Sequence, residues 1–200
     1  VWSAREFPSD SKAVEPLELA LRLDGYDTAM AKGLTPKAMR ALAARWGKST
    51  EGASGDSVYE VGCGCGAFLA AVGEVHTTAS LAGSDYSAKL VEYGRELFPW
   101  IDLAEYEGSQ IPVEPRFTHV SCVGAFMYFA NLDYAEIVLN RMMAKSTRTV
   151  SILDIPDLGL KAESEEFRRQ GYSDAEYAER YRGLDHLYFD RSWSIAQFDP

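Results

Sequence analysis

The sequence predicts an α/β fold in which a mainly parallel sheet carries helices on both faces. From Ser57 onward, short stretches rich in β-branched and aromatic residues alternate with stretches whose apolar residues recur every three or four positions. A glycine-rich turn at 62–66 directly follows the first strand-like stretch. Such alternation is typical of parallel strands joined by helical crossovers. With 200 residues, 46% of them hydrophobic, the chain is long enough to bury a substantial core.

Residues 1–56 are expected to form an N-terminal helical cap followed by a linker. Apolar residues there recur at helical spacing, and Pro16 and Pro36 stand where helices commonly begin. The segment 47–56 has no periodicity and many small polar residues, which predicts a surface linker. The remaining residues, 57–200, are expected to form the sheet domain.

Each element of that domain is placed by its own pattern. Strands are expected at 57–61, 80–84, 102–107, 117–123 and 147–155. Helices are expected at 67–75, 87–98, 134–144, 162–170 and 174–182. Ligands of such folds bind at the carboxyl ends of the strands, so the loops at those ends are the place to look for a site.

Composition excludes several kinds of partner. Twenty Lys and Arg against 30 Asp and Glu give a net charge of −10, which disfavours nucleic acid and favours a small-molecule substrate. No apolar run approaches the roughly 18 residues needed to cross a bilayer. Three cysteines cannot all pair, which suits a reducing, cytoplasmic location. Cys63 and Cys65 lack the spacing of a zinc site, so no metal is expected.

The glycine-rich turn predicts a ligand site. A strand that ends at Val61, followed by Gly62, Gly64 and Gly66, lets the backbone turn sharply and approach a ligand closely. Gly62, Gly64 and Ala67 also satisfy the glycine pattern of dinucleotide-binding folds, so the glycines do not decide between cofactors.

The segment VYEVGCGCGAFL resembles the first motif of the class I methyltransferase family, which has a Rossmann-like fold and uses S-adenosylmethionine. The resemblance implies that Gly62, Cys63, Gly64 and Gly66 border this cofactor. Glu60 could then receive the cofactor's ammonium group in a charge-assisted hydrogen bond. Its simpler interpretation is a surface carboxylate at a strand end.

Further cofactor contacts follow from the resemblance. Asp85, at the end of the second strand, can accept hydrogen bonds from both ribose hydroxyls, with Tyr86 beside it. Ser87 matches a family serine but also suits the N-cap of the next helix. Ser109 and Gln110 stand where the family often has an acid near the adenine, and that acid is absent here.

At the fourth strand, the resemblance places Val123 and Gly124 beside the transferred methyl group. His119 lies at the other end of that strand, so we expect it to bond to neighbouring groups rather than act as a base. Tyr26 is a candidate lid over the cofactor, and ordinary packing is an equal alternative.

The expected reaction is N- or O-methylation of a small-molecule acceptor. Asp154, His186 and Tyr188 are the candidate proton acceptors, because they lie at the end of the fifth strand and in the late segment where the family binds substrate. A structural role in an aromatic cluster is the alternative for His186.

The family usually closes its sheet with two further strands, and the sequence after 156 predicts no such strands but a last helix that ends near 198. The expectation is therefore an incomplete chain, a shortened sheet, or completion by another subunit, as in a homodimer. Two other functions stay open: an NAD-dependent oxidoreductase and a non-catalytic methyltransferase-like partner protein.

Overall fold

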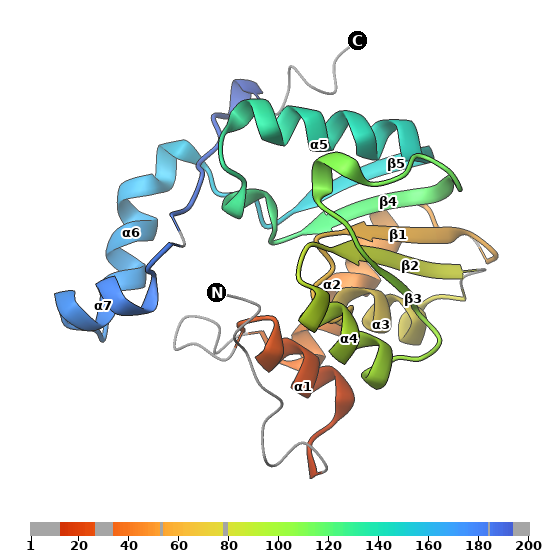
Figure 1. Ribbon diagram of the computed structural model, residues 1–200, viewed down its shortest axis with the longest axis horizontal. Helices are drawn as coiled ribbons and strands as arrows, with labels where there is room; N and C mark the ends of the chain where they lie inside the picture. Colours follow the sequence, from red (N-terminus) through yellow and green to blue (C-terminus); the bar gives the residue numbers. More distant parts are fainter. Residues whose placement is uncertain (1–12, 27–33, 53, 78–79, 184, 194–200) are drawn as a thin grey trace.

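The computed structural model describes residues 13–26, 34–52, 54–77, 80–183 and 185–193. Five strands form one sheet in the order β3-β2-β1-β4-β5, and every neighbouring pair is parallel (Figure 1). The strands are β1 (Ser57–Val61), β2 (Ser80–Asp85), β3 (Asp102–Glu105), β4 (Phe117–Val123) and β5 (Ser146–Leu153). The strand order reverses between β1 and β4, which is where ligands bind in open parallel sheets.

α-Helices and short 3₁₀ helices accompany the sheet in the described part of the chain. The α-helices are α1 (Pro16–Leu23), α2 (Pro36–Ser49), α3 (Ala67–Val75), α4 (Ala88–Leu97), α5 (Leu132–Lys145), α6 (Lys161–Arg169) and α7 (Asp174–Arg180). The 3₁₀ helices are η4 (Gly108–Gln110), η5 (Phe126–Tyr128) and η6 (Leu158–Leu160). The α/β fold with a parallel sheet is therefore confirmed.

Helix α2 continues to Ser49, so the linker expected from residue 47 begins later than predicted. Gly47 serves close packing here: a Cβ at this position would lie 2.0 Å from Nε2 of His76. The His76 ring thereby reaches the chain of α2, where Nε2 is 3.1 Å from the carbonyl oxygen of Ala43. The sequence did not predict that the helix extends through Gly47, because glycine is normally unfavourable inside a helix.

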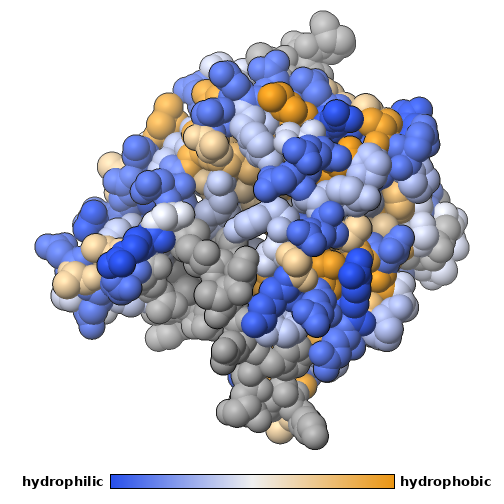
Figure 2. Space-filling model, viewed as in Figure 1, coloured by the Kyte–Doolittle hydropathy of each residue, from blue (hydrophilic) through white to orange (hydrophobic). Residues whose placement is uncertain are grey.

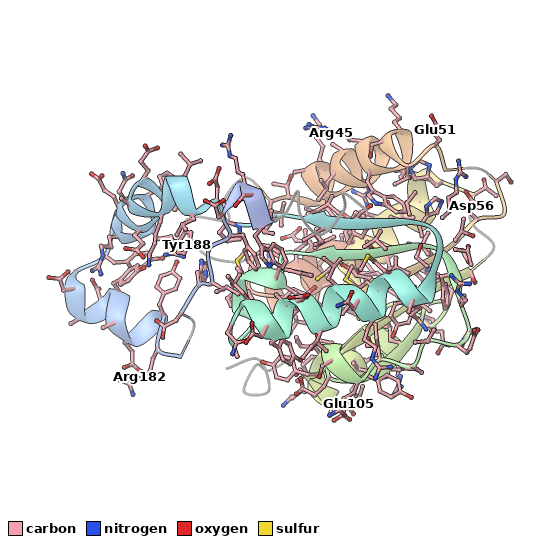
Figure 3. The ribbon with its side chains drawn as sticks, turned by 90° about the horizontal axis from the view of Figure 1, so that it is seen from above. Arg45, Glu51, Asp56, Glu105, Arg182 and Tyr188 are labelled. Carbon is pink, nitrogen blue, oxygen red and sulfur yellow. The ribbon has the colours of Figure 1, made fainter. Side chains whose placement is uncertain are left out.

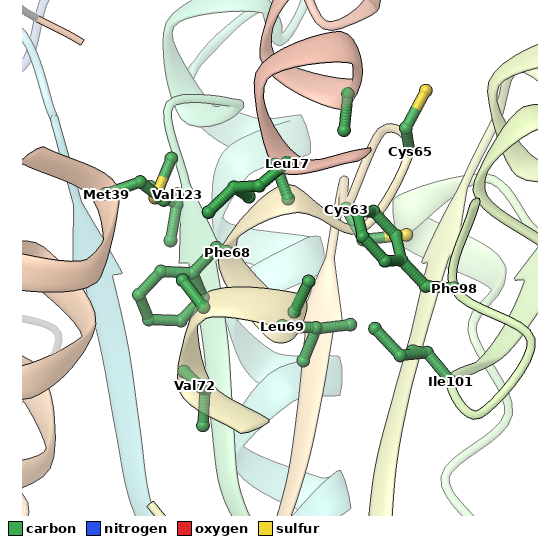
Figure 4. Packing of buried hydrophobic residues seen from close by; sticks show 14 of the residues in the cluster. Leu17, Met39, Cys63, Cys65, Phe68, Leu69, Val72, Phe98, Ile101 and Val123 are labelled. Carbon is green, nitrogen blue, oxygen red and sulfur yellow. The ribbon is translucent and has the colours of Figure 1, made fainter. Parts of the chain in front are cut away.

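Two hydrophobic clusters cover the two faces of the sheet. Side chains alternate between them along each strand, so Val58 belongs to one cluster and Tyr59 to the other. The first cluster joins the sheet to α1, α2, α3 and α4, and Figure 4 shows Leu17, Met39, Phe68 and Leu69 packed together in it. The N-terminal helices thus share the core of the sheet.

The second face carries α5 and, among the described residues, no crossover helix between β3 and β4. The chain over 106–116 is held there by Lys145, which is 1% exposed and donates hydrogen bonds to the carbonyl oxygens of Pro112 (2.8 Å) and Pro115 (3.0 Å). Its ammonium also lies 4.3 Å from the ring centroid of Tyr59. The segment 106–116 is therefore attached to this face by the hydrogen bonds of Lys145, and the ammonium is stabilised by a cation–π contact.

The amino ends of the strands are joined by His119, which is 1% exposed. Its Nδ1 is 2.7 Å from Oγ1 of Thr149 on β5, and its Nε2 is 3.0 Å from Oδ2 of Asp56 before β1. His119 thus bonds to neighbouring groups, as expected, at the end of the sheet opposite the glycine turn.

We predict that Leu69→Ala destabilises the protein by roughly 2–5 kcal/mol, because it leaves a cavity in the first cluster, where Leu69 is 0% exposed. The matched control is Leu160→Ala, where the same atoms are removed from a side chain that is 46% exposed. Urea unfolding followed by circular dichroism measures both. Equal losses in the two variants would contradict the assignment of the core.

Candidate functional site

The turn after β1 is shaped by glycines with positive φ. Gly62, Gly64 and Gly66 have φ of 69°, 54° and 85°. A Cβ on Gly62 would lie 2.6 Å from Cβ of Ala125, and one on Gly64 would lie 2.3 Å from Oδ1 of Asp24. Both positions therefore need glycine for conformation and for space.

Glu60 lies at the centre of this site, near the end of β1. Its side chain is 2% exposed, and Oε2 has no hydrogen-bond partner in the structure. Burial raises its pKa well above the usual value, and the carboxylates of Asp24 and Asp85 raise it further. Glu60 is therefore buried, in contrast to the surface interpretation. A buried carboxylate without a partner is a group that a cationic ligand would satisfy.

Asp85 ends β2 and supports the glycine turn. Its Oδ2 accepts a hydrogen bond from the amide of Gly64 (3.0 Å), and Oδ1 accepts one from the amide of Ser87 (2.9 Å). Each oxygen keeps acceptor capacity for a further donor. Burial raises the pKa of Asp85, and its two backbone hydrogen bonds act in the opposite direction. The hydroxyl of Ser87 accepts from the amide of Leu90 at 3.5 Å, which makes Ser87 the N-cap of α4.

Asp24, just after α1, is a site residue that sequence reasoning missed. Its Oδ1 accepts a 2.7 Å hydrogen bond from the amide of Cys65. This contact ties the N-terminal helices to the glycine turn across 41 positions of sequence. No local pattern in the sequence predicts a contact over such a distance. The one available signal was that Asp24 is an acid that lies two positions before the candidate Tyr26.

Tyr26, Gly124 and Asp154 come together at the ends of β4 and β5. The hydroxyl of Tyr26 lies 2.8 Å from the position that a Cβ on Gly124 would take, and Oδ2 of Asp154 lies 3.6 Å from it. Asp154 has a φ of 58°, and desolvation raises its pKa. Burial also raises the pKa of Tyr26, and Asp24, Asp154 and Glu60 add to that shift. These residues therefore share one surface with the glycine turn.

The remaining cofactor candidates follow the ends of neighbouring strands. Tyr86 is 51% exposed after β2, and Val123, 9% exposed, ends β4. Ser109 and Gln110 lie in η4 after β3, where the amide of Ser109 donates to the hydroxyl of Tyr134 at 3.4 Å. They follow β3, and their contacts with a ligand stay predictions.

His186 and Tyr188 lie on the segment that returns from α7. Arg168 donates hydrogen bonds to Nδ1 of His186 and, at 2.8 Å, to the hydroxyl of Tyr188. Burial, and then the charge of Arg168, lower the pKa of His186 to about 4. Because Nδ1 accepts from Arg168, the proton of the neutral ring sits on Nε2. His186 is thus arranged as a donor, which does not favour the role of a general base.

The thiols of Cys63 and Cys65 are buried and unpaired with one another. Burial is the main cause that raises the pKa of both thiols, which keeps them protonated. In the part of the chain that the structure describes, no three His, Cys, Asp or Glu side chains are grouped as metal ligands would be. None of the described helices is long and apolar enough to span a membrane.

Residues 58–144 match a family described as methyltransferase domain. The matched segment comprises somewhat less than half of the chain. A search of curated proteins finds no match.

Solved methyltransferases share the fold. Magnesium protoporphyrin IX methyltransferase from Synechocystis, solved with S-adenosylhomocysteine, is 16% identical with a TM-score of 0.59, over 81% of this chain and 70% of its own. A sugar N-methyltransferase from Streptoalloteichus is 17% identical with a TM-score of 0.55, over 65% and 53%. An S-adenosylmethionine-dependent methyltransferase from Clostridium acetobutylicum is 14% identical with a TM-score of 0.60, over 70% and 58%. The chain thus spans about half to two thirds of the length of several such structures.

We predict that Glu60→Gln stabilises the ligand-free protein more at pH 8 than at pH 5. Between the unfolded-state pKa of Glu, about 4.3, and the raised pKa in the folded chain, the folded state holds more protons than the unfolded state. Glu60 therefore lowers stability as pH rises through this window, and Gln removes that loss, which is roughly 1–3 kcal/mol for a buried unsatisfied group.

Urea unfolding at the two pH values measures the difference, with Glu96→Gln as the control because Glu96 is exposed on α4. A stability difference from the wild type that is the same at pH 5 and pH 8 would show that Glu60 does not titrate in this window.

Proposed function

We propose that this chain transfers the methyl group of S-adenosylmethionine to a nitrogen or oxygen of a small-molecule acceptor. The observation that carries the proposal is the carboxylate of Glu60, buried without a hydrogen-bond partner for Oε2 at the glycine turn. S-adenosylmethionine supplies, when bound, a methyl group on a positively charged sulfur. Its ammonium is the cation that Glu60 would receive.

The charge of the site supports this cofactor over NAD. Glu60 and Asp85 form no ion pair with a basic side chain among the described residues, and Asp24 lies close enough to raise the pKa of Glu60. A pyrophosphate placed on this turn would meet these carboxylates and be repelled. A ligand with positive charge and no phosphate is attracted instead.

The other cofactor contacts are proposed from position. The carboxylate of Asp85 would accept from the ribose hydroxyls while still holding the amides of Gly64 and Ser87. Tyr86, Ser109 and Gln110 would border the nucleoside, since they follow the carboxyl ends of β2 and β3.

The reacting groups would meet beside Gly124, between Tyr26 and Asp154. Methyl transfer needs mainly alignment of the acceptor and exclusion of water, and Tyr26 would cover this point as a lid. Asp154 is the best of the three proton-acceptor candidates because it lies beside Gly124 and desolvation raises its pKa, which makes it a stronger base. In His186 and Tyr188, the atoms that would accept the proton already accept hydrogen bonds from Arg168.

A small-molecule acceptor is supported by the names of two similar structures, a magnesium protoporphyrin IX methyltransferase and a sugar N-methyltransferase. Homodimer formation and a cytoplasmic location stay predictions from the sequence. Light scattering on the purified chain would decide the first.

We predict that the chain binds S-adenosylmethionine and S-adenosylhomocysteine but not NAD. Glu60→Gln should lower the affinity for both sulfur nucleosides by at least about tenfold, since a charge-assisted hydrogen bond is lost. Isothermal titration calorimetry measures the affinities, with Glu96→Gln as the control. Binding of NAD alone would favour an oxidoreductase. Binding of the sulfur nucleosides without turnover on a broad acceptor panel would favour the non-catalytic partner protein.

Cofactor binding should also release a proton. Burial raises the pKa of Glu60 in the ligand-free protein, and a bound ammonium favours the ionised form, so affinity should rise with pH until pH exceeds the raised pKa. Calorimetric titrations in phosphate and in Tris, two buffers with different ionisation enthalpies, measure the number of protons released on binding. The Glu60→Gln variant should release none, and an equal release in that variant would contradict the role of Glu60.

A further inference from the structure

Helix α6 carries a buried guanidinium that forms no ion pair with a carboxylate of the described residues. All residues of α6 are described, and Arg168 is the one that is buried, at 8% exposure. The surroundings of α6 and α7 are otherwise largely hydrophilic (Figure 2). In the described residues, Arg168 has no carboxylate within ion-pair distance, whereas other arginines do: Arg22, Arg40, Arg148, Arg169, Arg182 and Arg191.

The direct contacts of Arg168 within the described residues include no carboxylate, although Asp185 and Glu165 lie near enough to act on the pKa of His186 and of Tyr188. The guanidinium donates to Nδ1 of His186 and to the hydroxyl of Tyr188, and both partners are neutral. Its carbon lies 5.9 Å from the ring centroid of Tyr181 and 5.8 Å from that of Tyr188. The Nε–H has no hydrogen-bond partner in the structure. A chain with a net charge of −10 has ample acids to pair a structural arginine, so the unpaired state is informative.

A second donor in the same cluster is also free. Nε2 of His186 is buried and has no hydrogen-bond partner in the structure. It carries the ring proton, because Nδ1 accepts from Arg168. One buried cation and two unsatisfied N–H groups thus belong to one hydrogen-bonded cluster. Their chemistry suits an anion with several acceptor oxygens.

This cluster is adjacent to the proposed reaction site. The ring of His186 packs edge-on against Tyr128 of η5, with centroids 5.2 Å apart. The neighbouring amide of Leu187 donates to the carbonyl oxygen of Met127 at 2.8 Å, which fixes the returning segment to the end of β4. Figure 3 shows Tyr188 between the α6–α7 region and the sheet. Tyr128 also lies near enough to Tyr26 to raise its pKa, and the hydroxyl of Tyr26 lies beside Gly124, so η5 links the Arg168 cluster to that point.

We propose that Arg168, assisted by His186, binds a carboxylate of the methyl acceptor and so selects acidic acceptors. The inference rests on the proposed function, because the acceptor exists only if the chain is a methyltransferase. Arginine suits this role because its planar fork matches both carboxylate oxygens. The nearby rings of Tyr128, Tyr181 and Tyr188 favour a planar, aromatic acid.

The test uses the full chain saturated with S-adenosylhomocysteine and titrated with benzoate or with benzamide, its uncharged analogue. We expect the wild type to bind benzoate at least about tenfold more tightly than benzamide, because a hydrogen bond to a charged group adds more than a neutral one. Arg168→Gln should abolish this preference and Arg168→Lys should retain part of it. Arg169→Gln, the matched control at an exposed neighbour, should change benzoate affinity by less than about twofold.

Several outcomes overturn the inference. They are equal binding of benzoate and benzamide by the wild type, no benzoate binding, or unchanged benzoate affinity in Arg168→Gln. A loss of S-adenosylhomocysteine binding in a folded Arg168→Gln would place the residue at the cofactor instead. The comparison of benzoate with benzamide uses only the wild type. The test therefore stays decisive even if Arg168→Gln does not fold. Failure of the proposed function is distinct: the wild type would then bind neither sulfur nucleoside.

Discussion

The buried carboxylate of Glu60 is the constraint around which the site is organised. It can stay in the core of a parallel sheet only as a neutral acid or opposite a cation, because burial disfavours its charged form. Asp85 and Asp24 hold the amides of Gly64 and Cys65, so the glycine turn is fixed around Glu60 by two further acids. The ligand-free protein thus bears an electrostatic cost that a cationic cofactor would relieve.

The two ends of the sheet differ in role: contacts at the amino ends of the strands stabilise the fold, and the proposed ligand site lies at the carboxyl ends. At the amino ends, His119 joins Asp56 and Thr149 and leaves no free hydrogen-bonding capacity on its ring. Within the described residues, a buried polar atom lacks a partner in Glu60 near the end of β1, in Arg168 on α6, and in His186 on the segment that follows α7. Unsatisfied buried groups are costly, so these atoms are where bound molecules would complete the structure. In the proposed arrangement, the acids Glu60 and Asp85 would face the cofactor and Arg168 would face the acceptor.

Much of the fold was predictable because local patterns determine parallel strands and their crossovers. The bounds of β1, α3 and β4 agree with the sequence interpretation, since each combines a clear period with a glycine or charged boundary. The prediction was wrong where tertiary contacts override local preference. Helix α2 continues through Gly47 because the His76 ring packs there, and β5 starts at Ser146 directly after α5.

The sequence by itself determined the α/β class, the glycine turn, and the acids Glu60 and Asp85, because these depend on residue type and on spacing along one strand–turn–helix unit. Only the tertiary structure decided that Glu60 is buried without a partner, that Asp24 reaches the amide of Cys65, and that Arg168 orients His186 as a donor. Those contacts join residues far apart in the chain. Their energies depend on burial and on which charges are near, and a linear pattern specifies neither.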